Sequence, residues 1–446
     1  MINIPAAEAM KRFPRHQPVD PAQFSAPDTE LEVKFGLPRS VRFCRSCVIS
    51  NQRPNSTVEY THTKASAKKT IRFDDGVCDA CRVAQMKTKI DWTERERALR
   101  DLCDRHRRDD GRYDCIVPGS GGKDSFYAAH VLKYRYGMHP LTVTWAPHIH
   151  TDWGWRNFQK WIGAGFDNSL MTPNARVHRL LTRLSVETLF HPFQPFIIGQ
   201  KALAPKVSIL HEVPLVFYGE SEAEYGNPIA EVGEATRDRS FFSTADRDRL
   251  YLSGVSIGDL RREFGLDTND LAPYMPADPD ALRRAGTEVH YLGYYLNWHP
   301  QSCYYYAVEH GGFEASPERT PGTYSKYNSI DDRVDDLHYF TTHVKFGIGR
   351  ATYDAAQEVR SGDITREEAV ALVRRYDGEF PERFIDELLA YLSLPAAEYP
   401  AASRLFEQPA MDRAYFMHLA DRFRSPHLWR HEDGEWHLRH TVWQGN

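Results

Sequence analysis

From residue 113 onward, short apolar runs alternate with longer segments in which apolar residues recur every three or four positions. The short runs predict strands and the longer segments predict helices. The expected strands are CIVPGS, LTVTWAP, SLMTP and VPLVFYGE, which begin at residues 115, 141, 169 and 213. The expected helices between them include SFYAAHVLKYRYG and ARVHRLLTRLSVETLF, which begin at residues 125 and 175. Such alternation indicates an α/β fold with a parallel sheet and helices on both of its faces.

The same pattern divides the rest of the chain into units. The segment from Asp91 has the charged, amphipathic pattern of a linker helix, with Trp92, Leu99, Leu102 and Cys103 as its expected buried side. The expected units are a proline-rich, loosely docked extension (1–40), a cysteine-rich unit (41–90), the linker helix (91–112), the main α/β domain (113–352), a helical segment (353–395) and a C-terminal extension (396–446). Residues 240–290 read as an insertion with helices, and a capping box at Thr365 begins the first of two helices in the helical segment.

Composition narrows the class of protein further. The chain has 446 residues, a hydrophobic content of 41% and a formal net charge of −5. It contains neither an apolar run long enough to span a membrane nor one typical of a signal peptide, so we expect a soluble, cytoplasmic protein. The acidic balance argues against binding to nucleic acid, because such binding depends largely on cations that neutralise phosphates.

Four of the seven cysteines form two Cys-x-x-Cys pairs, Cys44 with Cys47 and Cys78 with Cys81. In a large protein of this class such pairs favour a metal site over disulfides. Four thiolates suit a structural Zn²⁺ without an open coordination position. An iron–sulfur cluster, cysteines without a ligand, and a zinc ribbon that binds nucleic acid remain as alternatives.

The sequence SGGKDS follows the first predicted strand directly and stands at the start of a helix. It matches neither the Walker A motif nor the dinucleotide-binding motif. Its glycines allow backbone N–H groups to face an anion at the positive end of the helix, and the lysine adds a positive charge. An aspartate within such a phosphate site implies Mg²⁺ between it and the ligand. The residues predicted to bind the phosphates are Ser120, Gly121, Gly122, Lys123, Asp124 and Ser125.

Further polar groups follow later strands. Glu220, directly after the fourth strand, is the expected second ligand of Mg²⁺ beside Asp124. Lys345 and Arg350 flank two glycines and are expected to stabilise charge on the phosphates during the reaction. Trp155 and Asn157, after the second strand, are expected to form a substrate-binding wall.

A run of four aspartates could be read as a set of metal ligands. It consists of Asp331, Asp332, Asp335 and Asp336. Because runs of like charge usually lie in water, we expect this run to be a solvated acidic face.

The loop SGGKDS resembles the PP-loop of the ATP pyrophosphatase superfamily, which cleaves ATP between its α and β phosphates. The ordered set CRSCVISNQRPN, FDDGVCDAC, SGGKDS, GFDNSLMTPN, FYGESEAEYG, YLGYYLNWHPQ and KFGIGRATYDAAQEV is similar to the N-acetyl sugar amidotransferases, over roughly residues 41–385. This resemblance implies a PP-loop domain with a four-cysteine zinc ribbon and C-terminal helices, in bacterial surface-polysaccharide or nonulosonate pathways. We also expect Glu224 and Tyr225 to contact the substrate.

The resemblance implies conversion of the acetamido group of a nucleotide-linked or free N-acetyl sugar into an acetamidino group. ATP activates the amide oxygen, AMP and pyrophosphate leave, and ammonia supplies the new nitrogen. None of the cysteines lies in a glutaminase motif, so we expect a separate glutaminase subunit. A PP-loop tRNA sulfurtransferase is the main alternative, although only Cys303 follows the loop. A non-catalytic nucleotide-binding or zinc scaffold protein is another.

Overall fold

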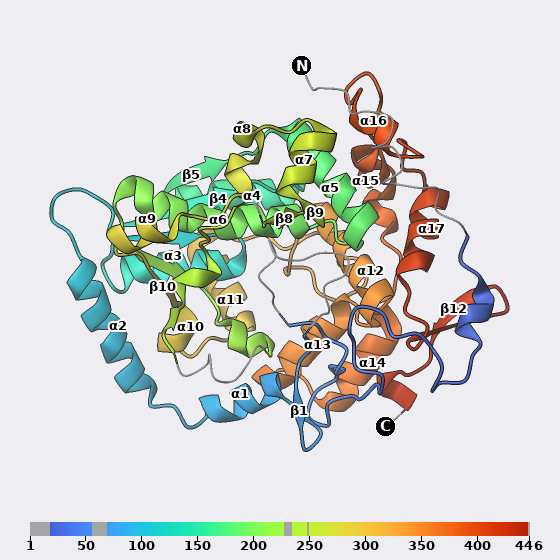
Figure 1. The fold of residues 1–446 in the computed structure, drawn as a ribbon. Coiled ribbons are helices and arrows are strands. Elements are labelled where there is room, and N and C mark those ends of the chain that lie inside the picture. Colours follow the sequence, from blue (N-terminus) through green and yellow to red (C-terminus); the bar gives the residue numbers. More distant parts are fainter. Residues whose placement is uncertain (1–17, 56–68, 227–233, 248, 445–446) are drawn as a thin grey trace.

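The computed structural model describes residues 18–55, 69–226, 234–247 and 249–444 (Figure 1). Its centre is a six-stranded sheet in the order β5-β4-β3-β6-β10-β7. The strands are β3 (Cys115–Pro118), β4 (Pro140–Trp145), β5 (Asp167–Met171), β6 (Leu215–Tyr218), β7 (Thr236–Arg237) and β10 (Glu288–Tyr291). All neighbours pair in parallel except β7, which is antiparallel to β10. The predicted α/β fold with a parallel sheet is therefore confirmed apart from the antiparallel strand β7, and all four expected strands lie in the sheet.

Alternate residues of the central strands face opposite layers of helices. The first layer contains α3 (Lys123–Tyr134), α4 (Asp152–Gly163) and α11 (Pro300–Gly311). Cys115 and Val117 of β3 share a core cluster with Phe126 of α3, whereas Ile116 shares another with Ala204 of α6 (Gln194–His211). Because both faces of the sheet are buried at its centre, β3 and β6 read as continuous apolar runs, which is why they could be recognised.

Other elements surround this core. They include the linker helix α2 (Trp92–His106), α5 (Ala175–Leu189), the short helix α10 (Leu292–Tyr295), and, in the predicted insertion, α7 (Ile257–Phe264), α8 (Thr268–Leu271), α9 (Pro279–Arg284) and the hairpin β8 (Tyr251–Leu252) with β9 (Val255–Ser256). Leu99, Leu102 and Cys103 are the buried side of α2, as predicted, while Trp92 is only half-buried. Strand β10 was not predicted, because its residues were read as the end of the insertion and the start of an aromatic run.

The helical segment contains α12 (Val334–Phe346), α13 (Arg350–Ser361), α14 (Arg366–Tyr376) and α15 (Ile385–Leu392). The predicted capping box is present, because the side chain of Thr365 accepts from the Glu368 amide and that of Glu368 accepts from the Thr365 amide. Helix α13 continues across the expected boundary between residues 352 and 353. The α/β domain and the helical segment are thus joined through one continuous helix.

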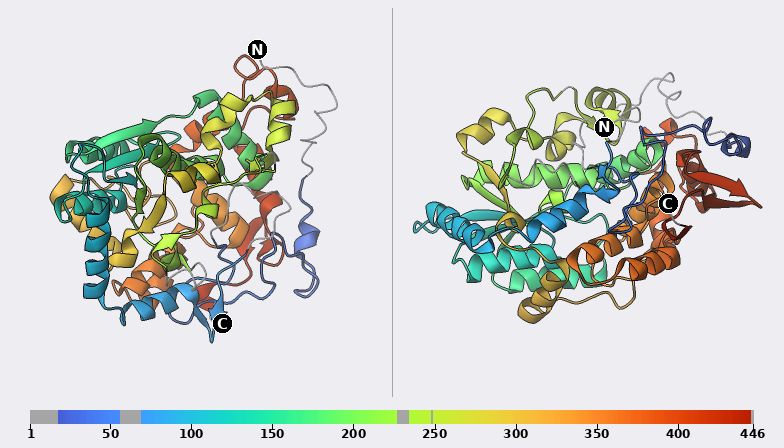
Figure 2. Two further views of the ribbon diagram at one scale, coloured as in Figure 1. Left: turned by 60° about the vertical axis from the view of Figure 1, so that its left-hand side comes forward. Right: turned by 90° about the horizontal axis from the view of Figure 1, so that it is seen from below.

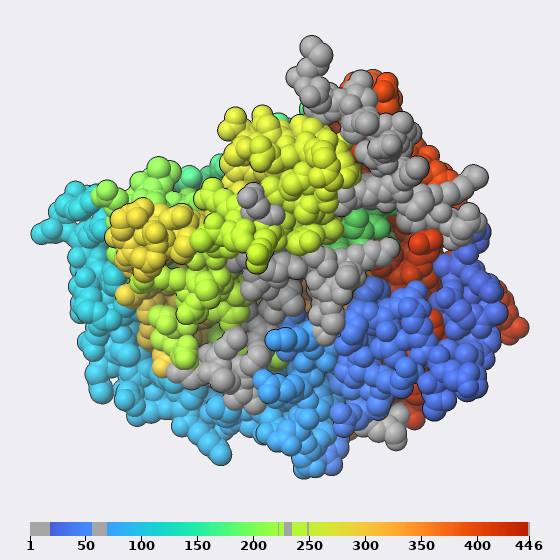
Figure 3. All heavy atoms as spheres, viewed as in Figure 1, coloured from blue at the N-terminus to red at the C-terminus, as the bar shows by residue number. Residues whose placement is uncertain are grey.

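The N-terminal extension is docked where the structure describes it, and the expectation of a loosely docked segment is wrong for residues 18–40. Phe24, Leu31 and Leu37 are buried. Phe24 and Leu37 pack with Phe346 and with Trp429 of the C-terminal hairpin, β11 (Trp429–Glu432) and β12 (Glu435–Leu438). Figure 3 shows the blue N-terminal segment beside red C-terminal atoms. Scattered apolar residues between prolines give no period, so the sequence did not reveal this packing; residues 1–17 lie outside the described part.

The C-terminal extension packs in the same way. Its helices are α16 (Ala402–Leu405) and α17 (Arg413–Phe423). Phe416 and Leu419 of α17 are buried in one cluster with Leu337 of α12 and Leu388 of α15. The two ends of the chain therefore support α12 from two sides.

Candidate functional site: a cavity at the phosphate loop

The predicted phosphate loop connects β3 to α3. Gly121 has a φ of +84°, and a Cβ there would lie 2.8 Å from Cα of Phe158, so only glycine fits without a shift. Gly122 is the N-cap of α3, and no side chain caps this end of the helix. A Cβ added to Gly122 would meet only Oγ of Ser120, at 3.8 Å. The twelve-residue helix thus begins with no capping side chain and with little packed over Gly122, and a helix start of this kind can bind an anion.

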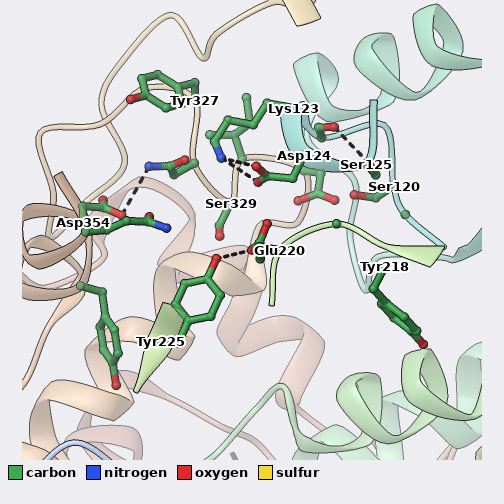
Figure 4. Close-up of a pocket in the computed structure, with 18 of the residues that line it drawn as sticks. Ser120, Lys123, Asp124, Ser125, Tyr218, Glu220, Tyr225, Tyr327, Ser329 and Asp354 are labelled. Atoms are coloured by element: carbon green, nitrogen blue, oxygen red, sulfur yellow. Dashed lines mark hydrogen bonds and ion pairs between the residues drawn. The ribbon is translucent and has the colours of Figure 1, made fainter. Parts of the chain in front are cut away.

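This loop forms one wall of a cavity of about 670 Å³. The other walls come from the end of β6 with Tyr218 and the following Glu220, from Gln200 and Lys201 of α6, from the segment 327–331 before α12, and from residues of α13. Figure 4 shows part of this lining. The cavity lies at the carboxyl ends of β3 and β6, where parallel sheets commonly bind ligands. Its volume is within the range of small-molecule sites.

Two carboxylates and a lysine meet beside the loop. Nζ of Lys123 lies 2.6 Å from Oδ2 of Asp124, and Glu220 accepts a hydrogen bond from the hydroxyl of Tyr225. In Figure 4 the side chain of Glu220 faces Asp124 and Lys123. Burial and the charge of Asp124 raise the pKa of Glu220 to about 7, although Lys123 and Tyr225 oppose this. Burial alone lowers the pKa of Lys123, but the attraction of Asp124 and Glu220 outweighs it and the pKa is raised.

The α13 wall carries a second set of ion pairs. Nε of Arg350 lies 3.1 Å from Oδ2 of Asp354, and its Nη1 donates to Oγ of Ser329 at 3.1 Å. Asp354 also accepts from the hydroxyl of Thr323 at 2.6 Å. Arg350 lines the cavity, so the structure brings this predicted cation to the loop's cavity.

Lys345 does not reach the cavity. It is buried, and its Nζ donates to the carbonyl of Leu189, at the C-terminal end of α5, at 2.7 Å. Another lysine, Lys201 of α6, does line the cavity. Its Nζ lies 4.6 Å from the ring centre of Phe241. Nothing in the local sequence of α6 distinguished Lys201 from an ordinary surface lysine.

Of the four predicted substrate contacts, the structure brings two to the cavity. Asn157 and Tyr225 line it, and the side chain of Asn157 also bonds both main-chain groups of Glu314 at 2.8 Å. Trp155 does not line the cavity; it is 44% exposed and packs beside His150. Glu224 lines a smaller neighbouring cavity of about 250 Å³, where it pairs with Lys87 at 3.1 Å.

The aspartate run is not a solvated face, and that expectation is wrong. Asp332, Asp335 and Asp336 are buried. Oδ2 of Asp332 accepts from the main chain of His148 at 2.7 Å, and Asp336 pairs with Arg383 at 2.8 Å.

Asp331 lines the cavity. Burial raises its pKa and a hydrogen bond from Ser120 opposes the increase. The approach of this aspartate to the phosphate loop could not be predicted, because the two are far apart in the sequence.

The four predicted metal ligands form a buried cluster in the cysteine unit. Their Sγ atoms all lie within 4.8 Å of one another, with Cys44 and Cys81 at 3.9 Å and Cys47 and Cys78 at 3.8 Å. A tetrahedron with Zn–S bonds of about 2.3 Å places sulfur atoms about 3.8 Å apart. The cluster therefore fits a single Zn²⁺, whereas a multi-iron cluster would hold the sulfurs farther apart.

Backbone amides support a thiolate at this position. The amides of Ser46, Cys47 and Cys78 lie 3.3 to 3.5 Å from Sγ of Cys44. Hydrogen bonds among the four thiols lower the pKa of Cys44 and raise the pKa of Cys47 and of Cys81, so the support for a thiolate comes from the amides. A metal ligand must be deprotonated, so these contacts favour metal binding.

The cysteine unit is docked on the helical segment and reaches the cavity. It contains β1 (Phe73–Asp74), β2 (Val77–Cys78) and α1 (Asp79–Lys87). Val48 and Ile49 share a core cluster with Ala355 of α13 and Ala369 of α14, and both views of Figure 2 show the blue unit near the orange helices. Ile49, Arg53, Ile71 and Ala80 of this unit line the cavity.

Comparison with known proteins covers the C-terminal part of the chain. Residues 321–442 match the family model described as "LPS biosynthesis protein WbpG-like, C-terminal domain". The matched region includes the cavity walls formed by residues 327–331 and α13. The matched region also extends into the C-terminal extension. The match supports an enzyme of lipopolysaccharide or other polysaccharide biosynthesis. Comparison with curated proteins gives no significant match. None of the described helices has the length and apolar character needed to cross a bilayer.

Proposed function

We propose that this protein is an ATP-dependent amidotransferase that converts the acetamido group of an N-acetyl sugar into an acetamidino group. The observation that carries the proposal is the uncapped helix N-terminus at SGGKDS, which opens into a 670 Å³ cavity beside Asp124 and Glu220. The matched polysaccharide-biosynthesis domain supports a sugar as the acceptor, because it supplies another wall of the same cavity.

The loop holds the two outer phosphates of ATP in this proposal. The amides of the first turn of α3 and the hydroxyls of Ser120 and Ser125 donate to phosphate oxygens. Lys123 moves its ammonium group from Asp124 to the phosphates, which leaves the Asp124 carboxylate free. Lys201 and Arg350 stand at the same cavity and stabilise negative charge that develops on the α-phosphate and on the leaving pyrophosphate.

Asp124 and Glu220 fit a divalent cation. The charges of Asp124 and Glu220 repel each other, and a cation between the two carboxylates removes that repulsion. Magnesium at this position would neutralise charge on the phosphates. It commonly takes one or two protein carboxylates and completes its shell with phosphate oxygens and water.

The reaction has two steps. The amide oxygen attacks the α-phosphorus, the bond to the β-phosphate breaks, pyrophosphate leaves, and the amide N–H gives up its proton. The resulting O-adenylyl imidate has AMP as a good leaving group. Ammonia then attacks the imidate carbon, the C–O bond breaks, and AMP departs from the amidine. An amide oxygen leaves poorly without this activation, so the first step is the one that the loop supplies.

Ammonia comes from a separate glutaminase subunit in this proposal. All seven cysteines are buried, which agrees poorly with a glutaminase nucleophile in this chain. Glutamine should therefore be hydrolysed only when the partner is present, and free ammonia should replace the partner in vitro.

Sulfur transfer to tRNA is less well supported. Such an enzyme needs a thiol that can reach the activated substrate, and the only cysteine after the loop is Cys303. Cys303 is 2% exposed, does not line the cavity, and has a pKa that burial raises. A thiol with a raised pKa is a weak nucleophile.

The test is incubation of UDP-N-acetylglucosamine, and other nucleotide-linked or free N-acetyl sugars, with the protein, ATP, Mg²⁺ and ammonium. Mass spectrometry should show a sugar lighter by the difference between O and NH, with AMP and pyrophosphate in equal amounts. Formation of ADP in place of AMP would contradict the mechanism. Dependence on a sulfur donor instead of ammonia would favour the sulfurtransferase.

A further inference from the structure

Two arginines on the α13 side of the cavity have no ion pair among the residues that the structure describes. Arg53 comes from the cysteine unit and Arg360 from the last turn of α13, and both line the cavity. Nη1 of Arg53 is buried and has no hydrogen-bond partner in the described part of the chain. A buried donor without a partner is unfavourable, so this position favours a ligand that can accept a hydrogen bond.

The structure fixes Arg53 firmly. Its amide donates to the carbonyl of Ser50 at 3.2 Å, and its carbonyl accepts from the Ile71 amide at 2.9 Å. The guanidinium carbon lies 5.5 Å from the ring centre of Tyr353. A Cβ added to Gly226 would lie 3.2 Å from Nη1, so this part of the main chain is also close to the guanidinium. The guanidinium is therefore held in place before any ligand binds, which lowers the entropic cost of recognition.

The carboxylates near these two arginines have other partners. Glu224 pairs with Lys87 at 3.1 Å, Asp354 pairs with Arg350 at 3.1 Å, and Glu358 accepts from the hydroxyl of Tyr324 at 2.6 Å. Burial lowers the pKa of Arg53, and the charge of Arg360 lowers it further, so the two cations lie close enough to repel each other. Burial of neighbouring cations without compensation is unfavourable, and an anion between them removes the penalty.

We propose that Arg53 and Arg360 form an anion subsite for the acceptor, separate from the phosphate loop, which binds either the diphosphate of a nucleotide-linked sugar or a carboxylate on the sugar itself. This inference rests on the proposed function only where it calls the ligand the acceptor, because binding of the anion does not require turnover. Arginine suits both ligands because its planar group bonds two oxygens of a phosphate or carboxylate at once. The cysteine cluster positions Arg53, so it contributes to substrate recognition as well as to folding.

The test is direct binding by calorimetry in the presence of Mg²⁺ and saturating α,β-methylene-ATP, which occupies the loop. The probes are UDP-N-acetylglucosamine, N-acetylglucosaminuronic acid and neutral N-acetylglucosamine. We expect at least one anionic probe to bind about tenfold or more tightly than the neutral sugar, because one charge-assisted pair has about this effect. The first probe identifies a diphosphate ligand and the second a carboxylate ligand.

Arg53→Gln and Arg360→Gln should each weaken the anionic probe about 10- to 100-fold and leave the affinity for the ATP analogue unchanged. The matched control is Arg72→Gln, on the same unit but with a side chain that is 71% exposed and outside the cavity. If Arg53→Gln loses its metal or its fold, Arg360→Gln on α13 carries the test. Three results would overturn the subsite. Both variants could bind the anionic probe as tightly as the unaltered protein does, the neutral sugar could bind as tightly as the anionic probes, or neither anionic probe could bind. If the variants lose binding of the anionic probe but the unaltered protein forms no amidine, the subsite stands and the proposed reaction is rejected.

Discussion

The two ends of the candidate site are built in different ways. The phosphate-loop end consists of one stretch of eight residues, 118–125, between a strand and its helix, and its shape depends on local glycines. The α13 end combines Asp331, which precedes α12, with Arg350 and Arg360 of α13, and docking of the cysteine unit on the helical segment adds Arg53. The first end is thus encoded locally, and the second depends on tertiary structure.

The largest effect should come from removal of the metal. Cys78→Ser takes one ligand from a cluster that fits a structural Zn²⁺, and such a metal contributes about 10–16 kcal/mol to folding in small zinc-binding peptides. The cysteine unit should lose its docking on α13, so that Arg53 leaves the cavity and binding of the anionic acceptor probe is lost, by about 100-fold or more in calorimetry. Binding of the ATP analogue should change much less, because the loop lies on β3 and α3.

The control for this experiment is Cys103→Ala. Cys103 is also buried, but it lies on α2 outside the cluster. The metal content of the Cys103→Ala variant, measured by mass spectrometry, should match that of the unaltered protein. If Cys78→Ser weakened binding of the ATP analogue as much as binding of the anionic probe, the two ends of the site would form one cooperative structure.

The next effect concerns the local end. Asp124→Asn keeps the shape of the side chain but removes the charge proposed to face Mg²⁺. We expect kcat/KM to fall about 100- to 1,000-fold, as when one group that stabilises a transition state is removed. Acceptor binding should remain, because Asp124 is not part of the α13 end. Asp152→Asn, at an aspartate whose side chain is 80% exposed, is the control, and full activity in Asp124→Asn would exclude its assigned role.

These contrasts explain what the sequence could predict. The strands, the linker helix, the capping box and the cysteine cluster were predicted because each has a short-range period or spacing. Strand β10 was missed because EVHY alternates weakly and lies beside an aromatic run. Lys345 was placed at the cavity because its neighbouring glycines suggested a flexible cationic loop, whereas it points from α12 to the end of α5. The four aspartates looked solvated because acidic runs usually are, and only tertiary contacts show three of them to be buried.

A third effect tests the electrostatics between Asp124 and Glu220. Because the pKa of Glu220 is raised to about 7, the group is largely protonated below that pH and ionised above it. The ionised form is the one that can ligate Mg²⁺, so at limiting Mg²⁺ kcat/KM should rise as the pH increases through the pKa, by up to about tenfold per unit. Higher Mg²⁺ should move the midpoint to lower pH, since the cation favours the ionised form.

Glu220→Gln should remove this pH dependence and leave a low, flat profile. Glu309→Gln, at an exposed position on α11, is the control. An unchanged midpoint in Glu220→Gln would assign the titration to another group.

The smallest effects separate Lys345 from Lys201. Lys345→Met keeps the length of a buried side chain but leaves the carbonyl of Leu189 without this donor. The free energy of unfolding, from urea titration, should fall by about 1–3 kcal/mol, while the KM for ATP stays within about twofold. Lys201→Met should do the reverse, because Lys201 lines the cavity: stability should change little and the KM for ATP should rise about tenfold. A raised KM in Lys345→Met alone, with its stability intact, would restore the role predicted for Lys345 and show that the loop end also depends on α12.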